Sequence, residues 1–507
     1  MWPSSDRDAD GRGGDDGTGR PARRTLGRRR VLAAVGATLL AGCNTASEAG
    51  DRPGTDSDRD PETAASTPTS TETTAGSDTP AGTPTGGGAT ETPTGGLNGT
   101  PNSSSETALP DLDAAPPPVT DGWRTYGNGP GNHGSVASDA PPGEDMGLYW
   151  RRYVEGQFSI PEPAVVDGTV YFGSGRFCYA LDQSDGTLGW ETELGEYAHV
   201  IAATVTDDTV YAGTRKISDP KLVRDTPGTL FALDRETGEV RWDRDAVLTS
   251  ATTVHDGHVY LSTTPNPPQR GLVRALDADT GETDWEHRIA AGDAGSETDT
   301  PTGAFGTPAL DPETGTLYVT GTVGADDDAS GVVLALDAAT GTEQWRVTTP
   351  GGIKHGPVLA DDRLYVGDAT GRVSAVSTAA ERVWETRIGE EGIDATPALT
   401  PDREAVCASS VGTLACLETA SGEARWARDV ADIRRSGLTI AGDHLYVGGV
   451  QFLVVNVDAG EVVAEVPVDG AGGAYGQPVV CDDTVYVGSC IKQGKRYVYD
   501  NYLYVMG

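Results

Sequence analysis

The chain has 507 residues and carries 76 Asp and Glu against 38 Lys and Arg, a formal net charge of −38 at pH 7. This balance excludes a nucleic-acid partner, because binding to phosphates requires clustered positive charge. The chain is rich in Thr and contains 68 Gly, which suits short strands and turns better than helices. Acidic residues occur in nearly every predicted turn, which is typical of adaptation to high salt. An acidic interaction surface is the alternative.

Residues 1–42 are predicted to be an export signal. Residues 20–30 read RPARRTLGRRR, and Arg28-Arg29 fits a twin-arginine signal. The apolar run that follows, residues 31–42, is too short to cross a bilayer of about 30 Å as a helix. Leu40-Ala41-Gly42-Cys43 resembles a lipobox, so we expect cleavage before Cys43 and lipid on its thiol, with a plain signal peptide as the alternative. The protein is thus expected on the outer face of the cell membrane, although one acyl chain binds weakly.

Residues 43–118 consist mainly of Thr, Ser, Pro, Gly, Asp and Glu. So few large apolar side chains cannot offset the entropy lost on ordering, which predicts a disordered stalk. Asn98-Gly99-Thr100 and Asn102-Ser103-Ser104 are N-glycosylation sequons. Export and the exposed context favour glycosylation at Asn98 and Asn102, and the Thr-rich tract suits O-glycosylation.

A repeated phrase organises the rest of the chain. Residues 333–345 read VLALDAATGTEQW, and similar phrases end at Trp190, Trp242 and Trp285. Weaker copies end at Trp384 and Trp426, and a copy around Gly460 has lost the Trp. A short apolar run, usually containing Tyr, precedes each phrase, and a unit such as 357–384 predicts four antiparallel strands joined by hairpins. A phrase that returns every ~40 to 60 residues indicates an array of stacked units.

The strand count predicts how the array closes. Eight second strands are recognisable, but only seven fourth strands, and the last unit stops at Gly507 after its third strand. Residues 148–152, LYWRR, supply the missing strand from the other end of the chain. We therefore predict that residues 119–507 form an all-β, eight-bladed β-propeller of four-stranded antiparallel blades, closed by the N-terminal strand joining the C-terminal blade. Seven blades, or an open β-solenoid with capping repeats, are the alternatives.

The phrase Ala-Leu-Asp-x-x-Thr-Gly-x-x-x-Trp resembles the tryptophan-docking motif of the pyrroloquinoline-quinone (PQQ) repeat propellers. These include quinoprotein alcohol dehydrogenases and BamB-like outer-membrane assembly lipoproteins. The resemblance covers about residues 150–507, and Trp123 with Asn132-His133-Gly134 is similar to the family's lead-in. It implies that each docking Trp packs between blades near the motif Gly, which carries over to Gly186 and Trp190, Gly238 and Trp242, Gly281 and Trp285, Gly341 and Trp345, and Gly422 and Trp426.

Two units depart from this motif, at Val376-Ser377 and at Asn456, so looser packing of blades five and seven is expected. The acidity and the export signal resemble those of secreted proteins of salt-loving archaea. Such cells have no outer membrane of the bacterial kind, and the role of BamB is therefore not carried over.

Two cysteines flank a predicted hairpin. With Val411-Gly412 as its turn, Cys407 and Cys416 form a non-hydrogen-bonded pair, the closer kind at about 4.5 Å. A disulfide is predicted there in an oxidising location, worth roughly 2.5–3 kcal/mol on the chain-entropy model. Two buried thiols are the alternative. Cys178 and Cys490 lie near second-to-third-strand turns of neighbouring blades and could meet, which would leave Cys481 as a buried free thiol. The pairing of Cys178, Cys481 and Cys490 is left open.

A ligand of such a propeller usually lies over the channel, where the fourth-to-first and second-to-third strand connections emerge. The longest insertions fall on those connections: 215–228, 264–271, 290–306 and 321–330. Drift of loop length is the alternative. Lys354-His355 and Arg434-Arg435 suit an anionic ligand, or else salt bridges with neighbouring acids. The residues expected at the channel rim are Thr249, Phe305, Lys354, His355, Asp394, Arg435 and Tyr475.

Two classes of function follow from the resemblance. A PQQ- and calcium-dependent dehydrogenase of alcohols or sugars requires a Glu/Asn/Asp cluster for Ca²⁺ and a catalytic Asp. No residues match these roles, and the adjacent cysteines of the alcohol dehydrogenases are absent, so we assign no catalytic, cofactor-binding or metal-binding residue. A repeat motif is evidence for fold more than for a cofactor. The favoured hypothesis is a monomeric, surface-anchored scaffold that binds a protein, glycan or small ligand; the dehydrogenase is the alternative.

Overall fold

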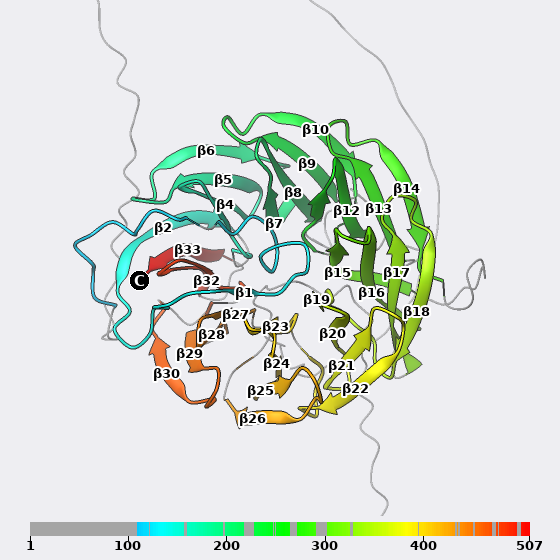
Figure 1. Cartoon of the computed structure of the whole chain (residues 1–507). Coiled ribbons are helices and arrows are strands. Elements are labelled where there is room, and N and C mark those ends of the chain that lie inside the picture. Colours follow the sequence, from blue (N-terminus) through cyan, green and yellow to red (C-terminus); the bar gives the residue numbers. More distant parts are fainter. Residues whose placement is uncertain are drawn as a thin grey trace, which may run out of the picture. The chain divides into compact units, whose positions relative to one another are not determined.

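The computed structural model describes residues 109–507 with gaps at 121, 157–159, 196–197, 217–227, 247, 249, 264–270, 291–301, 325–327, 394, 431–432, 434–436, 450–451, 469–472, 475 and 494–497. Cys43, Asn98 and Asn102 lie outside these residues, as does most of the predicted stalk. The described part is a ring of eight four-stranded antiparallel blades (Figure 1). The predicted fold class is confirmed.

The first four blades follow one another in chain order, each from an inner to an outer strand. Their strands are β3 (Ala164–Val166), β4 (Thr169–Ser174), β5 (Phe177–Asp182) and β6 (Leu188–Glu193); β7 (Ala198–Val205), β8 (Thr209–Lys216), β9 (Thr229–Asp234) and β10 (Val240–Asp245); β11 (Thr253–His255), β12 (His258–Thr263), β13 (Leu272–Asp277) and β14 (Thr283–Arg288); and β15 (Thr302–Asp311), β16 (Thr316–Val323), β17 (Ser330–Asp337) and β18 (Glu343–Thr349).

The last four blades continue the series. Their strands are β19 (Val358–Ala360), β20 (Arg363–Gly367), β21 (Arg372–Ser377) and β22 (Arg382–Arg387); β23 (Ala398–Leu399), β24 (Ala405–Ser410), β25 (Thr413–Glu418) and β26 (Ala424–Asp429); β27 (Leu438–Ala441), β28 (His444–Val447), β29 (Phe452–Asn456) and β30 (Val462–Val466); and β31 (Val479–Cys481), β32 (Thr484–Gln493) and β33 (Val498–Met506) with β2 (Leu148–Gly156) as the outer strand of blade 8.

The ring closes as the strand count predicts. β2 pairs antiparallel with β33, with Trp150 opposite Val505. Gly147 and Gly507, at the ends of these two strands, exchange backbone hydrogen bonds of 2.9 and 3.1 Å. Blade 8 is therefore assembled from both ends of the folded body, and its outer and third strands are not joined by a turn.

The folded body begins earlier than residue 119, so the predicted limit of the stalk is wrong. Leu112 donates its backbone N–H to Leu148 O at 2.8 Å, and Gln183 Nε2 donates to Pro117 O at 2.7 Å. The physical reason is two leucines at the end of the polar tract. Leu109 packs on an apolar cluster of blades 7 and 8, and Leu112 lies against Gly147.

The motif Asp and Thr shape the turn before each outer strand. Asp337 Oδ1 accepts hydrogen bonds from the backbone N and the Oγ1 of Thr340, at 2.9 and 2.8 Å. Gly341 follows with φ +67°, a left-handed conformation that costs other residues about 1–2 kcal/mol. This local chemistry explains why Asp, Thr and Gly recur together, as at Asp234 and Thr237 and at Asp277 and Thr280.

Each docking indole reaches the next blade rather than the Gly of its own motif. Trp285 of blade 3 packs on Gly341 of blade 4, where an added Cβ would overlap the indole ring. Its Nε1 donates to Ala338 O at 2.9 Å. Seven tryptophans make such a bond, at 2.5–3.0 Å: Trp150, Trp190, Trp242, Trp285, Trp345, Trp384 and Trp426.

We expect Gly341→Ala to lower the free energy of unfolding by about 2–3 kcal/mol, because it adds both left-handed strain and overlap with Trp285. Blade 5 provides the matched contrast. Ala380 occupies the equivalent position at φ +70° beside Trp345, so Ala380→Gly should change stability by less than about 1 kcal/mol. Denaturant unfolding of both variants measures the difference. Equal effects of the two substitutions would contradict this account of the motif Gly.

Candidate functional site

A segment of the chain itself crosses the centre of the ring at one end. The segment Trp123–Val136, here called the plug, includes β1 (Ser135–Val136) and runs over the centre of the ring (Figure 1, in cyan). β1 pairs parallel with β27, the inner strand of blade 7. Backbone carbonyls of the plug accept hydrogen bonds of 2.7–2.9 Å from the inner strands of six blades, through Val165, Val205, Leu310, Leu359, Leu399 and Ile440. The plug thus joins blades that are far apart in sequence.

A buried carboxyl group anchors the start of the plug. Glu162, just before β3, is only 4% exposed. Its Oε1 accepts hydrogen bonds from Trp123 Nε1 at 2.5 Å and from Gly127 N at 3.1 Å. Burial raises the pKa of Glu162 to about 8, and the two hydrogen bonds only partly oppose this shift. At pH 7 the neutral acid is therefore favoured.

Amide and hydroxyl groups hold the rest of the plug. Asn132 Nδ2 donates to Thr307 O at 2.9 Å and to Pro357 O at 3.2 Å, which links blades 4 and 5. Tyr126 OH donates to Thr396 Oγ1 at 2.9 Å on blade 6. Burial, followed by the charge of Glu162, raises the pKa of Tyr126. These polar groups serve to fix the plug on the inner strands.

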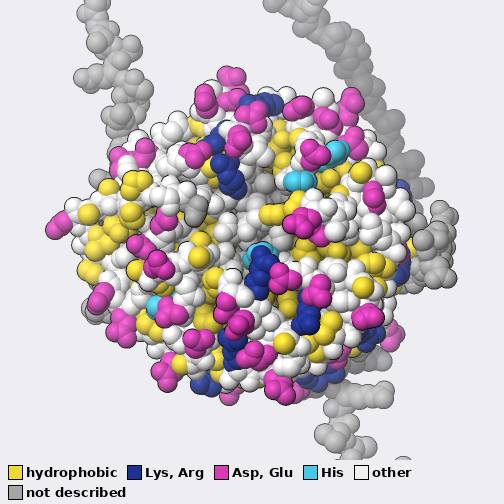
Figure 2. Space-filling model, viewed as in Figure 1, with side chains coloured by type: hydrophobic (Ala, Val, Ile, Leu, Met, Phe, Trp, Pro, Cys, Tyr) yellow, Lys and Arg dark blue, Asp and Glu magenta, His cyan; other side chains and the backbone are white. Residues whose placement is uncertain are grey.

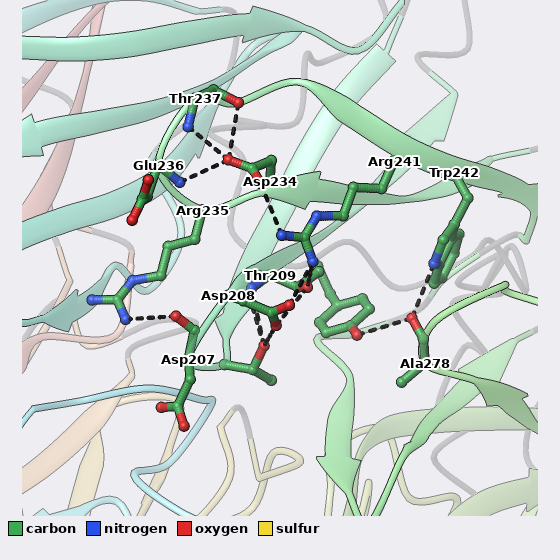
Figure 3. Close-up of polar contacts among 12 residues, drawn as sticks. Asp207, Asp208, Thr209, Asp234, Arg235, Glu236, Thr237, Arg241, Trp242 and Ala278 are labelled. Carbon is green, nitrogen blue, oxygen red and sulfur yellow. Dashed lines mark hydrogen bonds and ion pairs between the residues drawn. The ribbon is translucent and has the colours of Figure 1, made fainter.

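Surface acids around the plug are paired with arginines. Arg241 lies between Asp208 and Asp234, with both contacts at 2.8 Å (Figure 3). The hydrogen bond from Arg241, followed by those from Thr237, lowers the pKa of Asp234 to about 2. Arg124 of the plug contacts Asp207 at 3.2 Å. Exposed pairs of this kind are screened by water and salt, and each contributes little to stability.

The acidic side chains do not gather in a single patch on the face that carries the plug (Figure 2). They are spread over the whole of this face, among a few arginines and lysines. This distribution agrees with the even spread of acid along the sequence. It gives no support to a concentrated acidic docking surface on the face in view.

The predicted rim residues that the structure describes, Phe305, Lys354 and His355, precede the residues of their inner strands that bond to the plug, Leu310 and Leu359. Thr320 Oγ1 lies 2.9 Å from Phe305 O and 2.7 Å from His355 O, so its single hydroxyl proton can be donated to either carbonyl, and these two rim positions lie close together. Burial, and then the charge of Lys354, lowers the pKa of His355 to about 4, so the imidazole is neutral at pH 7. Lys354 is exposed, and no described carboxylate forms an ion pair with it. The other predicted rim residues lie outside the described residues: Thr249, Asp394, Arg435 and Tyr475.

The cysteines of the body take different states. Cys407 and Cys416 are joined by a disulfide, with Cα atoms 4.0 Å apart. The pair lies beside Trp426 in the sheet of blade 6, because Cys416 is the register partner of that residue. Cys178 and Cys481 are buried, and burial raises the pKa of Cys178 to about 12, which makes its thiol inert. The side chain of Cys490 lies outside the described part.

The described residues do not fit a calcium-bound quinone. Among them, no three His, Cys, Asp or Glu side chains gather where they could hold a metal ion. Glu162 is already bonded to Trp123 and Gly127, and its raised pKa opposes the ionised form that a hard cation requires.

No helix within the same residues is long and apolar enough to cross a membrane.

A family model described as "Outer membrane protein assembly factor BamB" matches residues 98–218, 218–320 and 329–494. The chain belongs to this BamB family. It is 24% identical over 286 residues to the outer membrane protein assembly factor BamB of Yersinia pestis, covering 50% of this chain and 63% of the relative. The predicted resemblance to PQQ-repeat propellers is confirmed.

Quinoprotein dehydrogenases are also similar to this BamB-family chain. The quinohemoprotein alcohol dehydrogenase ADH-IIG of Pseudomonas putida is 30% identical over 159 residues, but these are 29% of this chain and 22% of the relative. The crystal structure of the quinohemoprotein alcohol dehydrogenase of Comamonas testosteroni superposes with a TM-score of 0.61 at 16% identity, covering 76% of this chain and 80% of that one. The chain thus spans less than two thirds of these two sequence relatives, and the superposition shows the shared fold.

Two residues described above were assigned no role from the sequence: Trp150, which docks on the next blade, and Glu162, which anchors the plug. Trp150 docks on blade 1, although the turn motif that precedes the other tryptophans is missing before it. Its position in a predicted fourth strand, where the other docking tryptophans also lie, could have indicated this role. Glu162 precedes a proline at a position where other inner strands have uncharged residues. The charge of Glu162 could have indicated its role, because the residues before the equivalent prolines are uncharged. These pairs are Thr307-Pro308, Gly356-Pro357, Thr396-Pro397 and Gln477-Pro478.

Proposed function

We propose that this BamB-family chain is an exported protein, anchored through lipid on Cys43, whose propeller binds a protein partner at the end of the ring opposite the plug. The observation that carries the proposal is the plug. It crosses one end of the ring with hydrogen bonds to inner strands around it, so its polar groups are committed to the protein itself. The end that carries Phe305, Lys354 and His355 is therefore the one we assign to the partner.

The course of the chain before the plug supports this orientation. Thr120 donates its backbone N–H to Asp482 Oδ2 at 2.7 Å, and Pro117 accepts from Gln183, so this segment runs along the plug end of blades 8 and 1. We infer that the end carrying Phe305, Lys354 and His355 is the one left free for a partner, because the chain enters the body at the plug end. Lys354, an exposed cation in a chain of net charge −38, favours an acidic segment of the partner.

Site-specific photocrosslinking of the full chain in its native membrane tests the proposal. A photoreactive residue at Lys354 should capture one discrete protein, whereas the same residue at Asp207, on the plug end and 98% exposed at its side chain, should not. Lys354→Glu should reduce capture from a neighbouring rim position, Phe305, by about tenfold, equivalent to about 1.4 kcal/mol. Equal capture at the two ends, or capture only from Asp207, would refute it.

Similarity to a quinohemoprotein alcohol dehydrogenase supports a second candidate function, that of a PQQ-dependent dehydrogenase. Its test is reconstitution of the purified chain with PQQ and Ca²⁺ in high salt, followed by dye-linked oxidation of alcohols and sugars. We expect no turnover above the protein-free control, because the described residues do not fit the metal. Turnover that disappears with EDTA would replace the binding proposal by the enzymatic one.

A further inference from the structure

One interface between blades differs from the other seven. Seven outer strands carry a Trp that docks on the next blade, whereas the outer strand of blade 7 carries Ala464 at this position. The register identifies it: Ala464 pairs with Val454 just before a bulge, as Trp345 pairs with Ala335. The junction from blade 7 to blade 8, here called the seam, therefore lacks the indole and its hydrogen bond.

The partner of the missing Trp is absent from the seam as well. In the other blades the indole packs on the turn between the third and outer strands. Blade 8 has no such turn, because its third strand ends at Gly507 and its outer strand begins after Gly147, two glycines joined only by backbone hydrogen bonds. A Trp on blade 7 would meet no hairpin turn there, and so neither a turn Gly nor a turn carbonyl. The two losses thus have one cause: the third and outer strands of blade 8, β33 and β2, are not consecutive in the chain.

A short N-terminal segment occupies this place. Residues 109–112, here called the clasp, lie beside the start of β2. Leu112 N donates to Leu148 O and Leu148 N donates to Pro110 O, both at 2.8 Å. Leu109 packs with the apolar cluster that joins blades 7 and 8, and a Cβ added at Gly147 would lie 2.6 Å from Leu112. The clasp thus supplies apolar side chains and hydrogen bonds where the docking Trp is missing.

We infer that the clasp is a removable closure of the ring. While residues 109–112 are bonded to β2, the seam between blades 7 and 8 is shut. When they are cut away or pulled off, the apolar cluster and the edge of β2 lose their cover, and blade 8 loosens at this junction first. The clasp therefore both joins the upstream chain to the propeller and holds the seam, the weakest interface between blades, closed.

Two cleavage sites in the full chain test this inference. A sequence for a specific protease is inserted between Asp113 and Ala114, downstream of the clasp, where the chain is exposed. The matched control carries the same insertion between Glu106 and Thr107, so that its cleavage leaves the clasp on the body. After cleavage of the folded proteins, hydrogen exchange is followed by mass spectrometry in constant high salt.

The downstream cut should accelerate exchange by about tenfold to hundredfold in β30, β33 and β2. Peptides of β20 and β21 in blade 5 should exchange at their original rate, which shows that the ring is still folded. The upstream cut should change neither set. A full-length Leu109→Ser/Leu112→Ser variant should reproduce the local acceleration without any cut. Unchanged exchange at the seam in both the downstream-cut protein and the double variant would overturn the inference, as would equal acceleration in blade 5.

Discussion

Trp150→Ala is expected to lower the free energy of unfolding by about 3–5 kcal/mol and to release β2 from the ring. Trp150 is the docking residue of the strand that closes the ring. Its indole packs on Gly186, and its Nε1 donates to Gln183 O at 2.8 Å. β2 is also the one outer strand without a covalent turn to its blade. Loss of the indole therefore removes an attachment that a hairpin provides elsewhere.

Trp345→Ala is the matched control, because Trp345 makes the equivalent bond to Thr378 O at 3.0 Å within a covalently continuous blade. Both variants should be less stable in denaturant unfolding. Only Trp150→Ala should also expose β2 and β33 to rapid hydrogen exchange under native conditions. Comparable native-state protection of blade 8 in the two variants would show that the closing strand does not depend on its docking residue.

Glu162→Gln is expected to make the protein more stable than the wild type at pH 9 by several kcal/mol, and to change it little at pH 5. The folded pKa of Glu162, about 8, lies above its ordinary value of 4.5. The folded state therefore holds the proton more tightly, and the group's contribution to stability is complete below about pH 4.5 and lost as the pH rises through 8. Each unit of such a shift corresponds to about 1.36 kcal/mol. Gln cannot ionise, so this loss disappears.

Chemical denaturation at pH 5, 7 and 9 in constant salt measures the effect, and the difference between variant and wild type cancels the other titrating groups. Glu162→Ala separates charge from hydrogen bonding. It leaves Trp123 Nε1 and Gly127 N without their acceptor, and should therefore be less stable than Glu162→Gln by about 1–3 kcal/mol at each pH. A Gln variant with the same pH dependence as the wild type would refute the role assigned to this carboxyl.

Local patterns were sufficient for the ring itself. The turn that Asp337, Thr340 and Gly341 form depends on residues within one hairpin, and the same chemistry repeats in unit after unit. The pairing of Cys407 with Cys416 likewise follows from the register across a two-residue turn. Even the closure by β2 could be counted, because each unit needs four strands and one unit lacks its fourth. Such features depend on short-range contacts, which sequence periodicity records.

Tertiary structure alone decided what fills and seals the ring. The plug binds inner strands that lie up to several hundred residues away, through backbone groups that leave no pattern in the side chains. The burial that raises the pKa of Glu162 exists only when Trp123 and Gly127 lie over it. Leu109 and Leu112 look like the end of a polar stalk until the gap left by a missing Trp and a missing turn is formed beside them. Each of these properties depends on contacts between segments that are far apart in the sequence, and local sequence patterns do not indicate such contacts.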